Sequence, residues 1–82
     1  MEQQLPMVGG KVEGMSNVTY DLVTVLSSTG EAIDALDTYI EDAKKANNRE
    51  VQQLFEQIRQ DELRHCESLR NLITNQAKQG KL

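Results

Sequence analysis

The stretch of sequence that decides the fold runs from Val51 to Leu72 and reads VQQLFEQIRQDELRHCESLRNL. The residues found at alternating steps of four and three within it are Val51, Phe55, Ile58, Glu62, His65, Leu69 and Leu72. This heptad spacing places them on one side of an α-helix, and most of them are apolar. The pattern therefore predicts a helix whose apolar side packs against another helix, with Glu62 and His65 as polar exceptions on that side.

The preceding half of the chain carries a similar apolar stripe. Its members are Leu22, Leu26, Ile33, Leu36, Ile40 and Ala43, widened on one side by Val18, Val25, Ala32 and Tyr39. No proline follows Pro6, and only Gly30 interrupts the helix-forming residues of this stripe. Because proline and glycine are the residues that most disfavour a helix interior, the stripe predicts a second long amphipathic helix.

Polar residues mark where each helix begins. Ser16 or Asn17 can cap the first helix, because a short polar side chain satisfies the free backbone N–H groups there. Asn47, followed three residues later by Glu50, resembles a capping box for the second helix. The connection between the two helices is therefore expected to be very short.

The sequence predicts an all-α protein with helices over residues 17–45 and 49–78. A short connection forces the two helices to run antiparallel as a hairpin. Their apolar stripes are wider than one contact can cover, so we expect two hairpins to dimerise into a four-helix bundle. Residues 1–16 hold the only proline and three of the five glycines, and they are set apart as a flexible tail before the folded unit, residues 17–82.

The length of the chain points to the same dependence on a partner. A chain of 82 residues is one small domain, which buries too little surface to be more than marginally stable alone. Cys66 is its only cysteine, so no disulfide can form within the chain. Small scaffolds without disulfides rely on a metal or on other chains. A homodimer or higher homo-oligomer, a metal site, or both are expected.

Charge and hydropathy exclude several classes of protein. Lys and Arg number 9 and Asp and Glu number 13, which gives a net charge of −4. Such a chain lacks the basic patch of nucleic-acid binders, and no apolar run approaches the roughly 18 residues of a membrane span. The N-terminal residues also lack the basic and apolar segments of a secretory signal. A cytoplasmic protein without nucleic-acid or membrane partners is expected.

Glu62 and His65 are the residues most able to carry chemistry. They stand three residues apart, about one helical turn, so one metal ion can meet both a carboxylate oxygen and an imidazole nitrogen. An ionised carboxylate on a buried side is costly unless it is paired or bound to metal. Two other interpretations stay open: His65 as a hydrogen-bonded core residue, and Glu62 as the partner of Arg59 or of an arginine from another chain.

The first helix has acidic residues at about the same position along the hairpin axis as Glu62 and His65. If the turn centres near Ala46 and Asn47, Glu31 is level with Glu62 and is a candidate third metal ligand. Asp34 lies one turn from Glu31. The alternative is that these acids form a solvated helix face.

Two segments resemble the ferritin-like superfamily, most closely the encapsulated ferritin-like proteins. They are Glu31–Tyr39 (EAIDALDTY) and Arg59–His65 (RQDELRH), and the resemblance covers roughly residues 17–72. It implies a two-helix hairpin that dimerises into a four-helix bundle and binds iron across the dimer interface. It also implies oxidation of that iron, as in a ferroxidase, inside an encapsulin shell.

The same resemblance assigns roles to individual residues. Glu62 and His65 match metal ligands of the family, and Tyr39 matches a neighbouring tyrosine. Glu31 and Asp34 match acidic positions that flank the site.

The chain departs from the family pattern at one important position. The main ligand of the first helix would stand at position 32, where this chain has Ala32. Another alignment would ask for glutamate at position 29, which is Thr29. Either Glu31 takes the role of the missing ligand, or the site has lost it. The alternative function is therefore a metal-free hairpin that acts as a structural or protein-interaction module.

Overall fold

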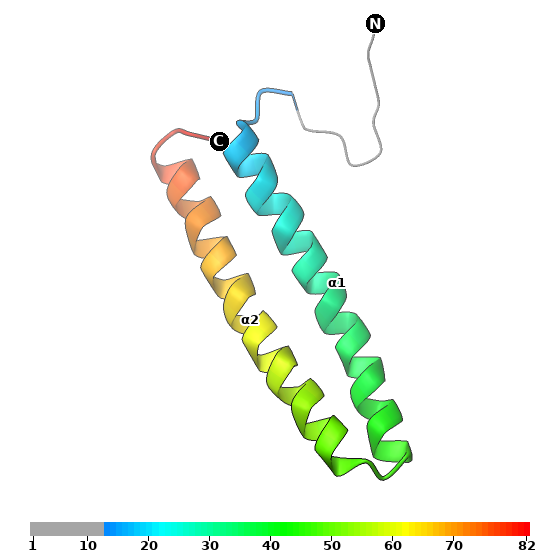
Figure 1. Cartoon of the computed structure of the whole chain (residues 1–82). Helices are drawn as coiled ribbons and strands as arrows, with labels where there is room; N and C mark the ends of the chain where they lie inside the picture. The colour runs from blue at the N-terminus through cyan, green and yellow to red at the C-terminus, as the bar shows by residue number, and fades with distance from the viewer. Residues whose placement is uncertain (1–12) are drawn as a thin grey trace, which may run out of the picture.

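The computed structural model describes residues 13–82 and contains two helices, α1 (Asn17–Lys45) and α2 (Arg49–Lys78). They run side by side in opposite directions, so the start of α1 and the end of α2 lie at the same end of the hairpin (Figure 1). This confirms the all-α hairpin and the expected bounds of both helices. Most of the expected tail, residues 1–12, lies outside the described residues.

The helix ends follow from local polar chemistry, with one correction. Ser16 caps α1 by accepting a hydrogen bond from the backbone N–H of Thr19. At α2 the cap is Asn48, whose Oδ1 accepts from the N–H of Val51 at 3.2 Å, and not Asn47 as expected. Asn47 instead adopts a left-handed backbone conformation with φ of 55°, which Asn tolerates better than most residues. The capping site is therefore displaced by one residue.

The side of α1 that faces α2 agrees with the expected stripe. Its positions are Thr19, Leu22, Leu26, Thr29, Ile33, Leu36, Ile40 and Ala43, which are the buried or half-buried heptad positions of the helix. All six predicted apolar members are among them. Two threonines complete the heptad spacing, and the hydroxyl of Thr29 donates to the carbonyl of Val25 at 2.8 Å, which explains how a polar group is accommodated there.

The side of α2 that faces α1 differs from the expected one. Its heptad positions are Gln52, Phe55, Arg59, Glu62, Cys66, Leu69, Ile73 and Gln76. Only Phe55, Glu62 and Leu69 also belong to the predicted stripe. The helix is rotated so that Ile58 and Leu72 lie beside the contact and remain exposed. Two heptad stripes overlap on α2, and a single partner helix can bury only one of them.

A polar cluster closes the end of the hairpin opposite the turn. Thr19 is only 1% exposed, and its hydroxyl lies 3.3 Å from the carbonyl oxygen of Lys81 and 3.3 Å from Nε2 of Gln76. The hydroxyl of Ser16 also donates toward Thr19 and Lys81. These bonds tie the residues after α2 to the first turn of α1.

Within residues 13–82, neither helix has a stretch long and apolar enough to cross a membrane.

Candidate metal centre on the open face of the hairpin

One side of the hairpin presents a row of mostly apolar residues to solvent. Each of them comes one residue before a residue of the helix–helix contact. In an antiparallel pair, the residues that precede the contact positions of the two helices lie on the same side of the pair. We refer to this side as the open face. Its residues are Val18, Val25, Ala32 and Tyr39 on α1 and Val51, Ile58, His65 and Leu72 on α2.

Contacts between the helices confirm that both halves of the open face lie together. Tyr39 of α1 packs on Phe55 of α2 with ring centroids 6.1 Å apart. A second group of neighbours places Val18 and Val25 of α1 beside Leu69 of α2. Exposure is high for an apolar surface: Val18 is 59% exposed, and Leu72 is 52% exposed. The open face is therefore a mostly apolar surface, interrupted by His65 and bordered by Asp21 and Asp42, that residues 13–82 of a single chain leave uncovered.

Glu62 and His65 lie together in the middle of this surface. The imidazole Nδ1 of His65 donates a hydrogen bond to Oε1 of Glu62 at 2.7 Å. The Glu62 side chain is 24% exposed, on the edge of the helix contact, whereas that of His65 is 64% exposed. His65 is therefore hydrogen-bonded, as one alternative expected, but it is not a buried core residue.

The pair carries two atoms of the kinds that bind metal ions. Two donors bonded to one tetrahedral ion at about 2.1 Å lie about 3.4 Å apart. The 2.7 Å between Nδ1 and Oε1 is shorter by about 0.7 Å, so both side chains must rotate apart before one ion can replace the shared proton. Oε2 of Glu62 and Nε2 of His65 stay available to other groups.

Arg59 does not take Glu62 as its partner in this chain. Its Nε donates to Oδ1 of Asp37 on α1 at 2.7 Å, on the side of the hairpin opposite the open face. Among residues 13–82, the partner of the Glu62 carboxylate is therefore His65. This leaves the charge of Glu62 available to a cation.

The acidic candidates on α1 do not join the pair. Glu31 stands midway between Thr29 and Ile33, which both face α2, so its exposed side chain lies on the outer side of α1. Asp34 is exposed as well. In the described part of the chain, no group of three His, Cys, Asp or Glu side chains comes close enough to hold a metal ion. One chain thus brings together Glu62 and His65 without Glu31.

The register of the helices also places Ala32 at the site. The pairs Tyr39–Phe55 and Asp37–Arg59 set Glu62 level with about residue 33 of α1, slightly displaced from the expected level at Glu31. Ala32 is consequently the open-face residue of α1 nearest in height to the Glu62–His65 pair. A methyl group stands where a ligand from α1 would have to be.

Tyr39 lies at a distance from the pair. It is level with Phe55, which is ten residues and about 15 Å along α2 from His65. Its ring is half exposed and forms one wall of a shallow apolar groove near the turn. Tyr39 is therefore a surface residue of the open face and not a contact of Glu62 or His65.

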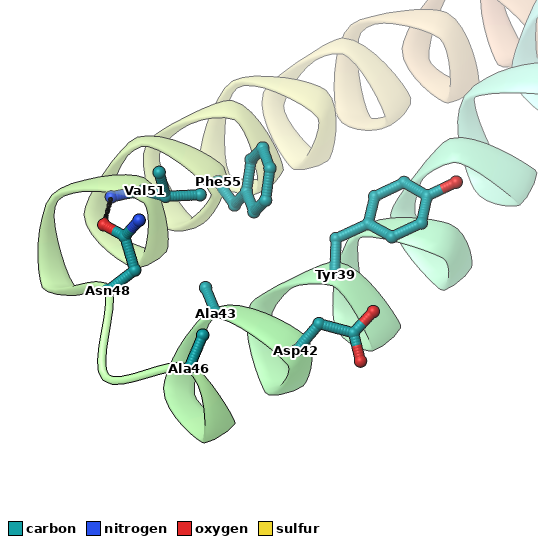
Figure 2. A pocket seen from close by; sticks show the side chains of 7 residues that line it. All are labelled: Tyr39, Asp42, Ala43, Ala46, Asn48, Val51 and Phe55. Atoms are coloured by element: carbon teal, nitrogen blue, oxygen red, sulfur yellow. Dashed lines mark hydrogen bonds between the residues drawn. The ribbon is translucent and has the colours of Figure 1, made fainter.

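The groove near the turn was not anticipated from the sequence. It has a volume of about 480 Å³ and is lined by Tyr39, Asp42, Ala43, Ala46, Asn48, Val51 and Phe55. Figure 2 shows Tyr39 and Phe55 projecting from the two helices beside the groove. The sequence feature that could have indicated this groove is the overlap of two heptad stripes on α2. One stripe packs against α1, so the residues of the other must line an exposed surface.

Comparisons of this chain with family models, with curated proteins and with solved structures found no match.

Proposed function

We propose that this chain is an iron-binding, ferritin-like hairpin that dimerises through its open face and holds metal between two copies of Glu62 and His65. The observation that carries the proposal is the position of this hydrogen-bonded pair. It lies midway along an exposed surface that is mostly apolar. A carboxylate and an imidazole are an unfavourable choice for an apolar contact unless they bind something there.

Dimerisation is supported by the exposed apolar residues. Contiguous apolar surface on a small soluble chain commonly marks a contact with another molecule. Residues 13–82 form two helices and no third layer over the open face, whereas a second copy offers a surface of the same chemistry. Two hairpins packed face to face form a four-helix bundle, which gives each helix a second buried side.

The pattern along α2 favours an antiparallel arrangement of the two copies. Ile58 and Leu69 stand at equal distances from the midpoint between Glu62 and His65, and so do Phe55 and Leu72. When α2 packs antiparallel on α2 of the partner subunit about that midpoint, apolar residues meet apolar residues on both sides. Glu62 then meets His65 of the partner subunit, which brings four ligand groups together.

The residues of the site have defined tasks in this proposal. Glu62 supplies a negative oxygen ligand, and His65 supplies a nitrogen ligand once the proton shared with Glu62 has left. The surrounding Ile58 and Leu72 exclude water when the open face is covered. Iron bound there supplies one-electron chemistry with oxygen, so oxidation of Fe²⁺ is the proposed activity. An encapsulin shell as partner and a cytoplasmic location rest on the resemblance and on the composition alone.

The direct test is metal analysis of protein purified in the presence of Fe²⁺. The wild-type chain is expected to retain iron and to melt at a higher temperature with it, since a ligand that binds only the folded state stabilises that state. The double variant Glu62→Ala/His65→Ala is expected to lose both effects. Glu67→Ala, which removes an exposed carboxylate one residue beyond the buried Cys66, is the matched control. Equal iron content in wild type and double variant would refute the proposal.

A second function is favoured by Ala32 and by the outward position of Glu31. Both reduce the number of ligands, as expected of a hairpin that has lost its site and serves as an oligomerisation or interaction module. This alternative predicts that the open face still forms a dimer, but that Fe²⁺ leaves the melting temperature and the size of the oligomer unchanged.

A further inference from the structure

We infer that the site binds a single divalent ion for every two chains, through two imidazoles and two carboxylates, and not a carboxylate-bridged pair of irons. This rests on the proposed dimer and concerns the number of ions that its ligands can hold. The decisive features are the groups around Glu62 and His65 that do not take part.

The number of donor groups is too small for two ions. Four-helix di-iron sites draw a glutamate from each of two helices and a Glu-x-x-His pair from each of the other two. Here α1 presents Ala32 at the level of the pair, while Glu31 lies on the outer side of the helix. Two chains then provide four ligand groups, which is a complete set for one four-coordinate ion and only two groups each for a pair.

Neighbouring carboxylates are committed elsewhere. Asp61, next to Glu62 in sequence, forms an ion pair with Arg64 and accepts a hydrogen bond from Nε2 of Gln57 at 3.1 Å. Asp37 is held by Arg59 on the opposite side of the hairpin. Neither is free to act as a bridging ligand without losing its partner.

Charge balance leads to the same number of ions. Two copies of Glu62 carry two negative charges, which neutralise one divalent ion. A second divalent ion would leave two positive charges uncompensated against the apolar open face around Ile58 and Leu72. Uncompensated charge in an apolar contact is strongly unfavourable.

The donor set also defines the class of ion. Two imidazoles with two carboxylates suit borderline divalent ions such as Fe²⁺, Co²⁺ and Zn²⁺, whereas Mg²⁺ and Ca²⁺ prefer sites made of oxygen ligands alone. The ion also links the two chains, because each chain contributes half of its ligands. Metal binding and dimerisation are consequently coupled.

Titration of the full chain with Co²⁺, followed by visible absorption and by analytical ultracentrifugation, tests this inference. The expected result is intense four-coordinate Co²⁺ bands that saturate at one ion for every two chains, together with a tighter dimer. Ala32→Glu adds two carboxylates to the dimer and is expected to raise the saturation point to two ions. Glu31→Gln, on the outer side, is expected to leave it at one.

Each other result has a defined meaning. Saturation at two ions per dimer in the wild type, or a lower saturation point in Glu31→Gln, overturns the single-ion inference and leaves the proposed metal site standing. If Ala32→Glu does not fold or dimerise, the wild type and Glu31→Gln still decide the number. Absence of any Co²⁺ or Fe²⁺ binding by the wild type overturns the proposed function and this inference together.

Discussion

Arg59 of α2 and Asp37 of α1 form an ion pair across the two helices, with Nε of Arg59 2.7 Å from Oδ1 of Asp37. Arg59 occupies a position of the helix contact where the sequence pattern predicted its neighbour Ile58. With Arg59 turned toward α1, Ile58 lies on the open face. This pair therefore accompanies the rotation of α2 that exposes His65 and the apolar residues around it.

The energy of this ion pair is expected to be small. The two side chains are 35% and 56% exposed, and solvent screens pairs of this kind. In a double-mutant cycle of Arg59→Ala and Asp37→Ala, followed by urea denaturation at fixed protein concentration, we expect a coupling energy of about 1 kcal/mol or less. A coupling well above this value would show that the pair, and not apolar packing, holds α2 in its rotation.

Charge on the open face should prevent dimerisation. Ile58 and Leu63 are 38% and 40% exposed, but Ile58 belongs to the open face and Leu63 to the opposite side. Ile58→Glu is expected to weaken the dimer about a hundredfold or more, since two apolar side chains lose their burial. Leu63→Glu, the matched control, is expected to leave dissociation measured by sedimentation unchanged. Similar weakening by both substitutions would place the contact elsewhere.

The direction of the partner can be read from distances between spin labels. Gln57, Arg64 and Asn71 are exposed positions on the outer side of α2, spaced seven residues or about two turns apart. Each can be labelled through a cysteine in a Cys66→Ala background. In the antiparallel dimer the label at Arg64 lies nearest the two-fold axis. Labels at Gln57 and Asn71 are then separated by about 20 Å more along the helix direction. Equal distances at all three positions would indicate parallel packing.

The buried hydroxyl of Thr19 should contribute measurably to stability. Thr19→Val keeps the shape of the side chain but leaves Gln76, Ser16 and the Lys81 carbonyl without their shared partner. We expect a loss of about 1–3 kcal/mol in the free energy of unfolding and faster amide exchange after α2. Thr38→Val, an exposed position on the same helix, is the control and should change stability by less than about 0.5 kcal/mol. An equal effect of both would make the hydroxyl network irrelevant.

Gly30 is expected to be replaceable by alanine. It lies within the uninterrupted helix α1, and a Cβ atom built on it meets nothing within 4 Å. Because glycine costs about 1 kcal/mol in a helix interior, Gly30→Ala should raise the thermal stability without altering the dimer. A loss of stability or of oligomer would indicate that another helix approaches this side of α1.

Much of the hairpin could be predicted because it depends on local chemistry. The bounds of both helices follow from capping residues, from the absence of proline after Pro6 and from the heptad periodicity. The contact side of α1 follows from its single apolar stripe. The proximity of Glu62 and His65 is also local, since residues three apart on a helix always lie close together.

Two features of the candidate site could not be predicted in the same way. The overlapping stripes on α2 share Phe55, Glu62 and Leu69, and periodicity alone does not choose between neighbouring positions about 100° apart on the helix. The position of Glu31 along α1 suggested a ligand, although the apolar stripe of α1 turned Thr29 and Ala32 inward instead; whether Glu31 could still reach the pair depends on how α2 is rotated about its axis. Both features depend on helix rotation.

The amino-acid sequence by itself thus determined two helices, their ends, their antiparallel order and a carboxylate–imidazole pair on α2. Only the tertiary structure decided that the pair lies midway along an open, mostly apolar face, level with Ala32 and apart from Glu31. The reason is that secondary structure depends on contacts within a few residues. The rotation of one helix against another depends on contacts between distant residues, such as Asp37 with Arg59 and Thr19 with Gln76.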